Sequence, residues 1–519
     1  MNENKPTFAA FLDMEKAFDR INRDLLFLRL LEYGIDGKIY NSIKNLYDDN
    51  KSSILLNGVS TDWFNVTSGV RQGDTLSPIL FSLFINELAI GIKNLNLGID
   101  IGGKQLSILL YADDIVLMSD SEENLQQILN FSHEWCQKWM LKVNIEKSNV
   151  IHFRKTRKTC TSYEFKCGDC ILKTVPQYTY LGITLDEHLT FANCMKSRTC
   201  AASRAFGKLI STCHKLKDVG YNTYCQLYDS LVVPVHDYAS EIWGFKNTNI
   251  CNKVHENAMR FYLGVHKLTP LPALYGEMGW IAVKYRHYLN IFRFWNRMMQ
   301  LPNTSITKHV FQRDITLSTT NENNWSGNFK KLLICLMFYD ANNWETRIFY
   351  LNEIKEKLLS LMETNWLNDM HNKPKLRRYI TFKTKLVVSD HVKKYISKPR
   401  RSLLVQLLTG ILPLNLETGR YKTLKDPVTK QIRSLRIEER LCTVCDLSET
   451  EDEIHFICTC TLYENHRQIL FQNITESNPN FLQLTKVEKY LFLVHNSWKA
   501  LAKFVEVAWS LRKLKLYIT

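Results

Sequence analysis

The sequence predicts an α+β protein, in which a mixed region of strands and helices is followed by a mainly helical remainder. Short apolar runs with β-branched residues surround an acidic pair near residue 113, as in a buried hairpin with a polar tip. From about residue 190 onward strand signals are few, and apolar residues recur at helical spacing. Helices are expected within 22–49 (two), 80–88, 119–141 (capped by Ser119), 402–409 and from 496 onward.

Composition narrows the class of protein. The 519 residues are 45% hydrophobic, which is enough for two to four domains with real cores. Lys and Arg (67) exceed Asp and Glu (52), and the net charge of +15 favours a polyanionic partner. The 14 cysteines are scattered, and no secretory signal precedes the first motif, so an intracellular, non-secreted protein is expected. No apolar run is long enough to span a membrane.

Two groups of carboxylates stand where apolar runs end. Asp13 follows the run 8–12, and Asp113 and Asp114 separate the runs 107–111 and 115–118. Adjacent acids are often only loop residues or helix caps, but carboxylates against a core are costly unless a cation neutralises them. Oxygen ligands suit Mg²⁺, and a pair of such ions serves in-line phosphoryl transfer.

A third motif lies between the two acidic groups. In SGVRQGDTLSP (68–78) the two glycines allow close backbone approach, and Ser77 with Pro78 marks a helix entry with Ser77 as cap. Together with FLDMEKAFD (11–19), YADD (111–114), NIEKS (144–148) and YLG (180–182), the chain resembles the reverse transcriptase of non-LTR (LINE-like, jockey-type) retrotransposons.

This resemblance implies a right-hand polymerase palm, an antiparallel sheet flanked by helices, followed by helical parts and a small zinc knuckle. The implied domains are a palm with partial fingers (22–60), a thumb, a connection region, the knuckle and C-terminal helices, at 1–185, 186–300, 301–435, 436–470 and 471–519. It implies an RNA-directed DNA polymerase that adds dNTPs to a primer 3′-hydroxyl. The implied partners are an RNA template and a DNA primer or target, met in a nuclear and cytoplasmic ribonucleoprotein.

The resemblance also assigns roles to the acids. Asp13 and one acid of YADD would bridge two Mg²⁺ ions, with the backbone carbonyl of Met14 as an extra oxygen. Because neighbouring residues of an extended segment point to opposite faces, Asp113 is expected to be the direct ligand. Asp114 is expected to lie close by and to be less essential.

Four further residues are assigned to the nucleotide. Phe18 would collide with a ribose 2′-hydroxyl, or would simply be a core aromatic. Gln72 and Gly73 would pack against the incoming nucleotide and the template. Lys147 would protonate pyrophosphate, or would be a surface lysine beside a strand.

Primer and template contacts are assigned to two places. Tyr180, Leu181 and Gly182 resemble the hairpin that grips the primer end, where glycine suits a tight backbone. Arg71 would contact phosphate, or would be a solvated arginine before a turn.

A cysteine and histidine constellation follows near the C-terminus. Cys442, Cys445, His455 and Cys460 offer three thiolates and an imidazole at short spacing, which fits one structural Zn²⁺. Cys458 is a rival for the fourth position. Because protein would fill all four positions, the expected role is RNA or DNA binding rather than catalysis.

One departure from the family pattern leaves an alternative function. Only twelve residues precede Asp13, where the family carries a fingers region, so a truncated element or a gene model that begins at an internal methionine is expected. The alternative is a catalytically inert nucleic-acid-binding remnant that acts through its basic surface and zinc knuckle. A group II intron maturase shares the palm, but the knuckle argues against it. The sequence leaves the oligomeric state open.

Overall fold

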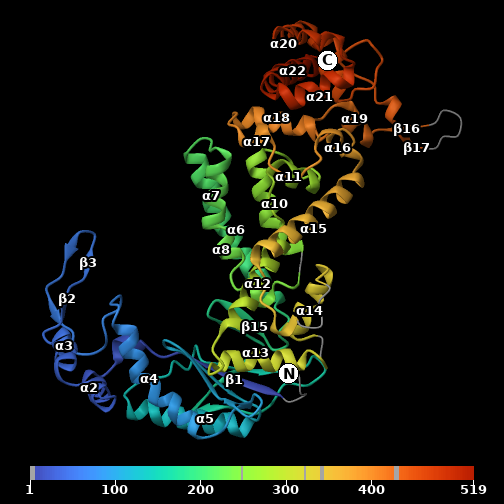
Figure 1. Ribbon diagram of the computed structural model, residues 1–519. Coiled ribbons are helices and arrows are strands. Elements are labelled where there is room, and N and C mark those ends of the chain that lie inside the picture. Colours follow the sequence, from blue (N-terminus) through green and yellow to red (C-terminus); the bar gives the residue numbers. More distant parts are fainter. Residues whose placement is uncertain (1–5, 247–248, 321–322, 339–343, 426–431, 519) are drawn as a thin grey trace. The chain divides into compact units, whose positions relative to one another are not determined.

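The computed structural model describes residues 6–246, 249–320, 323–338, 344–425 and 432–518 (Figure 1). The chain forms two compact units: unit 1 is Met1–Cys194 with Gln300–Asn328, and unit 2 is Met195–Met299 with Phe329–Thr519. Unit 1 combines a sheet with helices and unit 2 is mainly helical, so the predicted α+β class is confirmed. Residues 301–328 belong to the predicted connection region, and the structure packs them in unit 1; the finer domain boundaries stay predictions.

A five-stranded sheet is the centre of unit 1. Its strands, in spatial order, are β13 (Lys173–Thr174), β10 (Asn149–Phe153), β1 (Thr7–Leu12), β9 (Asp114–Ser119) and β8 (Ile108–Tyr111). Neighbouring strands are antiparallel, except that β10 and β13 are parallel. β1 is the central strand of the sheet. Both of its faces are buried, in line with its continuous apolar run.

Unit 1 also contains further helices and strand pairs. The helices are α1 (Ala17–Arg20), α2 (Arg23–Glu32), α3 (Gly37–Tyr47), α4 (Ser77–Asn94), α5 (Glu122–Lys138) and α13 (Ile306–Leu317). The strand pairs are β2 (Lys51–Ser52) with β5 (Phe64–Asn65), β3 (Leu55–Leu56) with β4 (Val59–Ser60), β6 (Ile99–Asp100) with β7 (Gln105–Leu106), β11 (Lys166–Cys167) with β12 (Cys170–Ile171), and β14 (Gln177–Tyr180) with β15 (Ile183–Asp186).

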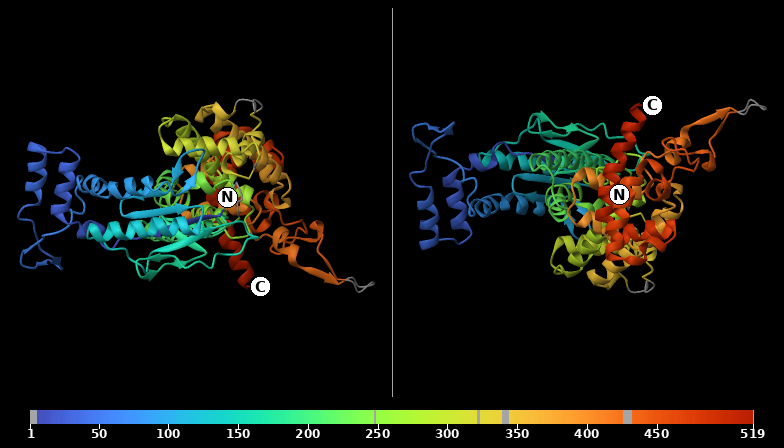
Figure 2. Two further views of the ribbon diagram at one scale, coloured as in Figure 1. Left: turned by 90° about the horizontal axis from the view of Figure 1, so that it is seen from below. Right: turned by 90° about the horizontal axis from the view of Figure 1, so that it is seen from above.

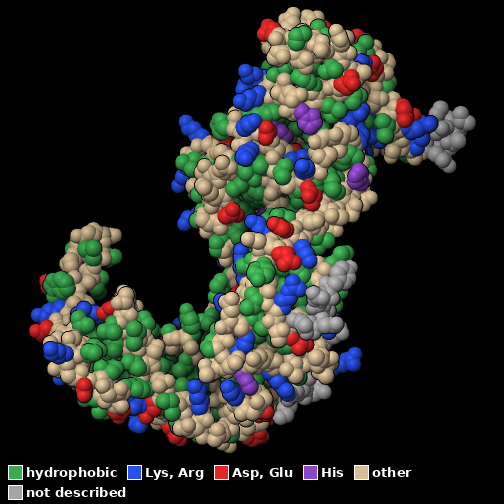
Figure 3. Space-filling model, in the orientation of Figure 1, with side chains coloured by type: hydrophobic (Ala, Val, Ile, Leu, Met, Phe, Trp, Pro, Cys, Tyr) green, Lys and Arg blue, Asp and Glu red, His purple; other side chains and the backbone are tan. Residues whose placement is uncertain are grey.

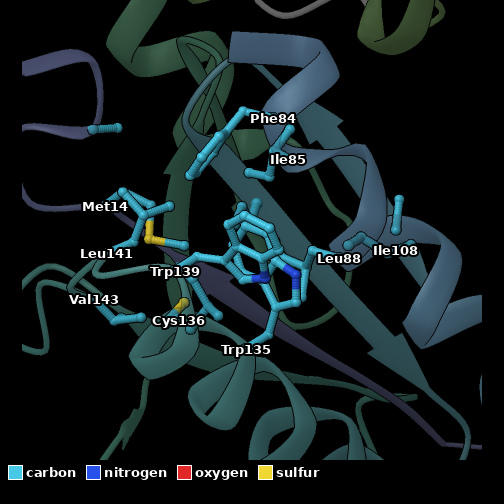
Figure 4. Close-up of a cluster of buried hydrophobic side chains, with 14 of the residues drawn as sticks. Met14, Phe84, Ile85, Leu88, Ile108, Trp135, Cys136, Trp139, Leu141 and Val143 are labelled. Carbon is cyan, nitrogen blue, oxygen red and sulfur yellow. The ribbon is translucent and has the colours of Figure 1, made fainter. Parts of the chain in front are cut away.

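The two faces of the sheet have different cores. Alternate residues of β1, such as Phe8 and Leu12, belong to the larger core with α4 and α5, which lie alongside one another (Figure 2). Trp135 of α5 and Trp139, which directly follows α5, are buried in this core (Figure 4). Phe11 belongs to a smaller core on the opposite face, against which the β14–β15 hairpin packs.

The predicted helix over 119–141 is confirmed as α5, and its apolar stripe is buried as expected. The predicted cap was wrong, because Ser119 is the last residue of β9 and the Ser121 side chain accepts the capping hydrogen bond. Ser77 likewise does not cap α4: its hydroxyl donates to the Arg71 carbonyl at 2.6 Å. Strand β9 thus extends to Ser119, one residue beyond the apolar run that predicted it.

The two helices expected within 22–49 are confirmed as α2 and α3. On α2 the most deeply buried residues are Leu26 and Leu30, whereas Leu28 and Leu31, whose helical spacing predicted this helix, are 48% and 46% exposed. The strand pairs between residues 51 and 65 also leave large apolar side chains in solvent, among them Leu55, Leu56 and Trp63 (Figure 3). Helical spacing therefore predicted the helices but not what covers them.

Unit 2 is built from helices, with one strand pair. The elements are α6 (Ala192–Lys215, which begins in unit 1), α7 (Tyr221–Leu231), α8 (Val233–His236), α9 (Ser240–Trp243), α10 (Asn249–Leu263), α11 (Leu271–Met278), α12 (Val283–Gln300), α14 (Trp325–Cys335), α15 (Leu351–His371), α16 (Tyr379–Phe382), α17 (Asp390–Lys393), α18 (Lys398–Leu408), α19 (Asn415–Thr418), β16 (Thr423–Lys425) with β17 (Ile432–Ser434), α20 (Glu464–Ser477), α21 (Lys486–Asn496) and α22 (Trp498–Ile518). The expected helices over 402–409 and from 496 onward are confirmed as α18 and α22. Among the described residues, no helix combines the length and the apolar character needed to cross a bilayer.

Candidate active site and metal centre

Asp13 directly follows β1, and Asp114 is the first residue of the neighbouring strand β9. β1 and β9 pair with Leu12 opposite Ile115, so the next residues in this register are Asp13 and Asp114. Opposed residues of an antiparallel pair have Cα atoms about 4.5–5.5 Å apart. Asp13 shares the alternation of Phe11, which packs in the smaller core, and the same alternation along β9 assigns Asp114 to that face.

Asp113 lies in the two-residue turn between β8 and β9, after Ala112, whose φ is 53°. The sequence argument ranked Asp113 above Asp114 because neighbouring residues of an extended segment point to opposite faces. That reason was wrong, since Asp113 is a turn residue and only Asp114 belongs to a strand. Which of the two is the more important metal ligand stays a prediction.

The three acids form one electrostatic group. Burial, followed by the negative charges of Asp113 and Asp13, raises the pKa of Asp114. Like charges gathered at one point repel unless a cation lies among them. A set of carboxylate oxygens that remains partly exposed fits Mg²⁺, which keeps several of its waters.

The backbone of Asp13 is held by the segment 144–148. The Asp13 carbonyl accepts from Asn144 N at 2.8 Å, and Asp13 N donates to the Ser148 hydroxyl at 3.1 Å. Lys147 of the same segment approaches the side chain, with its Nζ 3.7 Å from Asp13 Oδ2. The structure therefore brings Lys147 to the acidic group, and its role as a proton donor stays a prediction.

The carbonyl of Met14 is not used by the bridge that Met14 forms with Val143. The two hydrogen bonds of that bridge use the carbonyls of Asp13 and Lys142. The side chain of Met14 is buried in the larger core. This arrangement leaves its carbonyl as a candidate ligand, as the resemblance implies.

Phe18 lies beside the glycine segment. Its ring stacks on Phe81 with centroids 4.7 Å apart, and its carbonyl accepts from Val70 N at 2.8 Å. Gly69 has a φ of 79°, and a Cβ there would lie 2.6 Å from the Asp19 carbonyl oxygen, so close backbone approach does require glycine. Phe18 packs against the core while staying partly exposed, which leaves its proposed steric role a prediction.

Gln72 and Arg71 both have protein partners. The Gln72 amide donates to Asp19 Oδ1 at 3.0 Å, and the Arg71 guanidinium donates to the Leu46 carbonyl at 2.7 Å. Arg71 is thus tied to the end of α3 and is not simply solvated. Gly73 has a φ of 92° and open space where a Cβ would be, so its backbone conformation, not crowding, favours glycine. The predicted contacts of these residues with nucleotide, template or phosphate stay predictions.

The β14–β15 hairpin brings two tyrosines to the acids. Its turn residues Leu181 and Gly182 have φ values of 46° and 77°, as a type I′ turn requires. Tyr178 stacks on Phe11 with centroids 4.6 Å apart, and Tyr180 lies 5.5 Å from the same ring. Burial, followed by the charges of Asp13 and Asp114, raises the pKa of Tyr178. The predicted primer grip therefore lies next to the acidic group.

Sequence reasoning missed two residues of this region. Arg23 donates to the Gly69 carbonyl at 2.9 Å and to the Val66 carbonyl at 2.7 Å, so it fixes the glycine segment. Nothing in its local sequence marks this role. Tyr178 precedes Tyr180 by two residues, and strand alternation would have assigned both rings to one face.

The four predicted zinc ligands lie together in unit 2. One donor atom from each of Cys442, Cys445, His455 and Cys460 lies within 4.8 Å of the others. Cys458, the rival ligand, is not in this cluster, and its thiol lies 3.7 Å from the Lys486 carbonyl. Three sulfurs and one nitrogen at these separations fit a tetrahedral zinc site.

Glu449 orients the histidine of this cluster. His455 Nδ1 lies 3.0 Å from Glu449 Oε2, while His455 Nε2 lies 3.4 Å from the Cys445 sulfur. A carboxylate that accepts from Nδ1 fixes the tautomer in which Nε2 offers its lone pair to a metal. The donor set therefore fits the implied ion in orientation as well as in number.

A second group of potential ligands, His236, Asp237 and His287, is buried in unit 2. Asp237 accepts from Arg286 Nε at 2.8 Å and from Arg286 Nη2 at 3.1 Å. His236 Nδ1 lies 2.7 Å and His287 Nε2 3.1 Å from Asp237 Oδ1. Because the arginine already neutralises this carboxylate, the group is better described as a buried ion-pair network than as a metal site.

Comparisons with known proteins identify the N-terminal region. Residues 1–185 match the family model described as "Reverse transcriptase (RNA-dependent DNA polymerase)". The probable RNA-directed DNA polymerase from transposon BS of Drosophila melanogaster is 28% identical over 262 residues, 49% of this chain and 28% of the relative. The polymerase from mobile element jockey of Drosophila funebris is 25% identical, over 47% of this chain and 27% of the relative. The Pol polyprotein of element R2DM of Drosophila melanogaster is 30% identical, over 34% and 17%.

This chain spans about a third or less of the length of these relatives. Among solved structures, a telomerase from Candida albicans in complex with a fragment of telomeric RNA covers 72% of this chain and 49% of its own. That match has 10% sequence identity and a TM-score of 0.30.

Proposed function

Because this chain carries a reverse transcriptase domain whose relatives are the RNA-directed DNA polymerases of non-LTR retrotransposons, we propose that it copies RNA into DNA. The observation that carries the proposal is that Asp13, Asp113 and Asp114 come together at the adjoining ends of β1, β8 and β9. All three lie within residues 1–185, which match the family model. The proposed substrates are dNTPs, an RNA template and a DNA primer or target. The proposed setting is intracellular, in nuclear and cytoplasmic ribonucleoprotein.

In this proposal the acids hold two Mg²⁺ ions, and the Met14 carbonyl supplies a further oxygen. Bound there, the ions would stabilise the attacking and leaving oxygens of the phosphoryl transfer. The protein's own contribution is position. The segment 144–148 fixes the Asp13 backbone, and the tyrosine hairpin would hold the primer end beside it.

Primer extension tests the proposal. The full chain is given an RNA template, an annealed DNA primer, dNTPs and Mg²⁺, and it is compared with Asp113→Asn. We expect extension by the wild-type chain and its loss in the variant or on chelation of Mg²⁺. Asp62→Asn, which removes one exposed carboxylate elsewhere in unit 1, is the matched control and should extend normally. RNA binding without extension by the wild-type chain would leave only the nucleic-acid-binding alternative.

For the second site we propose one structural zinc, held by Cys442, Cys445, His455 and Cys460. All four positions would be filled by protein, so the ion would support folding and nucleic-acid binding rather than chemistry. Purified protein should contain about one zinc per chain by elemental analysis, since tetrahedral Cys₃His sites hold a single ion.

Two cysteine variants separate the ligands from their neighbour. Cys442→Ser should lose most of the zinc, whereas Cys458→Ser should keep it because that thiol lies outside the cluster. Full zinc content in Cys442→Ser would exclude this site, and loss in Cys458→Ser alone would reassign the fourth ligand.

A further inference from the structure

A groove of about 440 Å³ is lined by residues of α20 and α22, on the C-terminal part of unit 2. Figure 1 labels these two helices near the C-terminus. The two helices pack against one another over the core that also contains the Cys442 cluster. All of the residues that line the groove belong to these two helices.

The floor of the groove is aliphatic. Ile469 of α20 is 57% exposed and Val507 of α22 is 39% exposed, and Leu470 and Phe504 lie beneath them. Scattered apolar side chains on a surface need no explanation, but apolar side chains gathered in a concave site mark a binding surface. The exposed floor therefore points to an occupant that brings its own apolar side chains.

The rim of the groove is basic. Lys499 and Lys503 are exposed and lie one helical turn apart on α22. None of the described residues that line the groove is acidic. The nearby Glu506 of the same helix accepts from Arg400 Nε at 2.6 Å, so its charge is already paired. The rim thus favours a negatively charged occupant.

We propose that this groove docks an amphipathic helix of a protein partner, with aliphatic anchors along one side and acidic residues beside them. A helix laid in a groove presents such anchors at three- and four-residue spacing, which suits an aliphatic floor between two helices. Single-stranded nucleic acid fits less well, because its bases stack on exposed aromatic rings. Of the two rings in the lining, Phe504 is 5% exposed and the His466 imidazole is half-buried. The proposal does not depend on polymerase activity.

Fluorescence anisotropy of the full chain tests it with defined probes. One probe is a labelled 16-residue helical peptide with leucines on one face and glutamates beside them. The second is a scrambled peptide of the same composition, and the third is a labelled dT20 oligonucleotide. We expect saturable binding of the first peptide, weaker binding of the scrambled one, and loss of affinity as NaCl rises.

Matched variants assign the binding to the groove. Lys499→Glu with Lys503→Glu should weaken peptide binding about tenfold or more, since two attractions become repulsions. Ile469→Asp should do the same through the floor. Lys513→Glu, on the same helix outside the groove, should bind as wild type does. Equal binding by all variants, or no binding of the peptide, overturns the proposal. So does dT20 binding that is lost in the same groove variants, because the occupant would then be nucleic acid.

Discussion

Asp13→Asn is expected to slow primer extension at least about 10³-fold, equivalent to about 4 kcal/mol of transition-state stabilisation. Asp13 follows β1, whereas Asp113 and Asp114 are adjacent residues of the β8–β9 hairpin, so of the three acids only Asp13 comes from a separate segment of the chain. Asparagine is nearly isosteric and keeps the backbone hydrogen bonds to Asn144 and Ser148. The loss should therefore come from the missing negative charge.

The measurement is the rate of single-nucleotide addition over a range of Mg²⁺ concentrations. We expect the concentration for half-maximal rate to rise in Asp13→Asn, which a purely structural role would not produce. Thermal unfolding should be unchanged or slightly improved, because one of three repelling charges is gone. A rate within tenfold of wild type at the same Mg²⁺ would contradict the assignment.

The same assay ranks the two acids of the YADD turn. The register brings Asp114, not Asp113, opposite Asp13 on one face of the sheet. Comparing Asp114→Asn with Asp113→Asn decides between this geometry and the family pattern, which favours Asp113. The larger loss identifies the residue that shares an ion with Asp13.

Asp237→Asn is expected to destabilise unit 2 by about 3–5 kcal/mol, the usual cost of removing one partner of a buried ion pair. Asp237 accepts from Arg286, His236 and His287, and these hydrogen bonds hold its pKa well below the usual value despite its burial. Asparagine would remove the carboxylate charge to which the Arg286 guanidinium is hydrogen-bonded.

Urea unfolding, followed by hydrogen exchange over residues 228–300, measures this loss locally. The double variant Asp237→Asn with Arg286→Gln is the control. It should be less destabilised than the sum of the two single variants, because the pair loses both charges together. A loss below about 1 kcal/mol in Asp237→Asn would place the pair among ordinary surface interactions.

The sequence predicted well wherever chemistry is local. Cys442, Cys445, His455 and Cys460 are close enough in sequence for one short segment to bring the donors together, and the structure does so. The apolar stripe of α5 and the acidic hairpin followed from periodicity, since alternation and helical repeat depend on neighbouring residues alone.

The errors arose where a distant segment decides the environment. Ser119 seemed a helix cap because its pairing with β1 is invisible in the local sequence. The spacing of Leu28 and Leu31 predicted a helix, but which face of α2 is buried depends on the segments that pack against it. The arginines that support the fold, Arg23 on the glycine segment and Arg286 on Asp237, gave no signal because their partners lie tens of residues away.

The sequence by itself therefore determined which chemistry to expect, because that expectation rests on residue type and short spacing. Carboxylates predict a site for divalent ions, and thiolates with an imidazole predict a site for zinc. The tertiary structure alone decided the arrangement. In the folded chain the strand register aligns Asp114 with Asp13, and Lys147 and Tyr178 lie beside the acids. The groove between α20 and α22 also exists only in the folded chain. Such contacts join residues far apart in the chain, and their free energy depends on burial and register that no local pattern encodes.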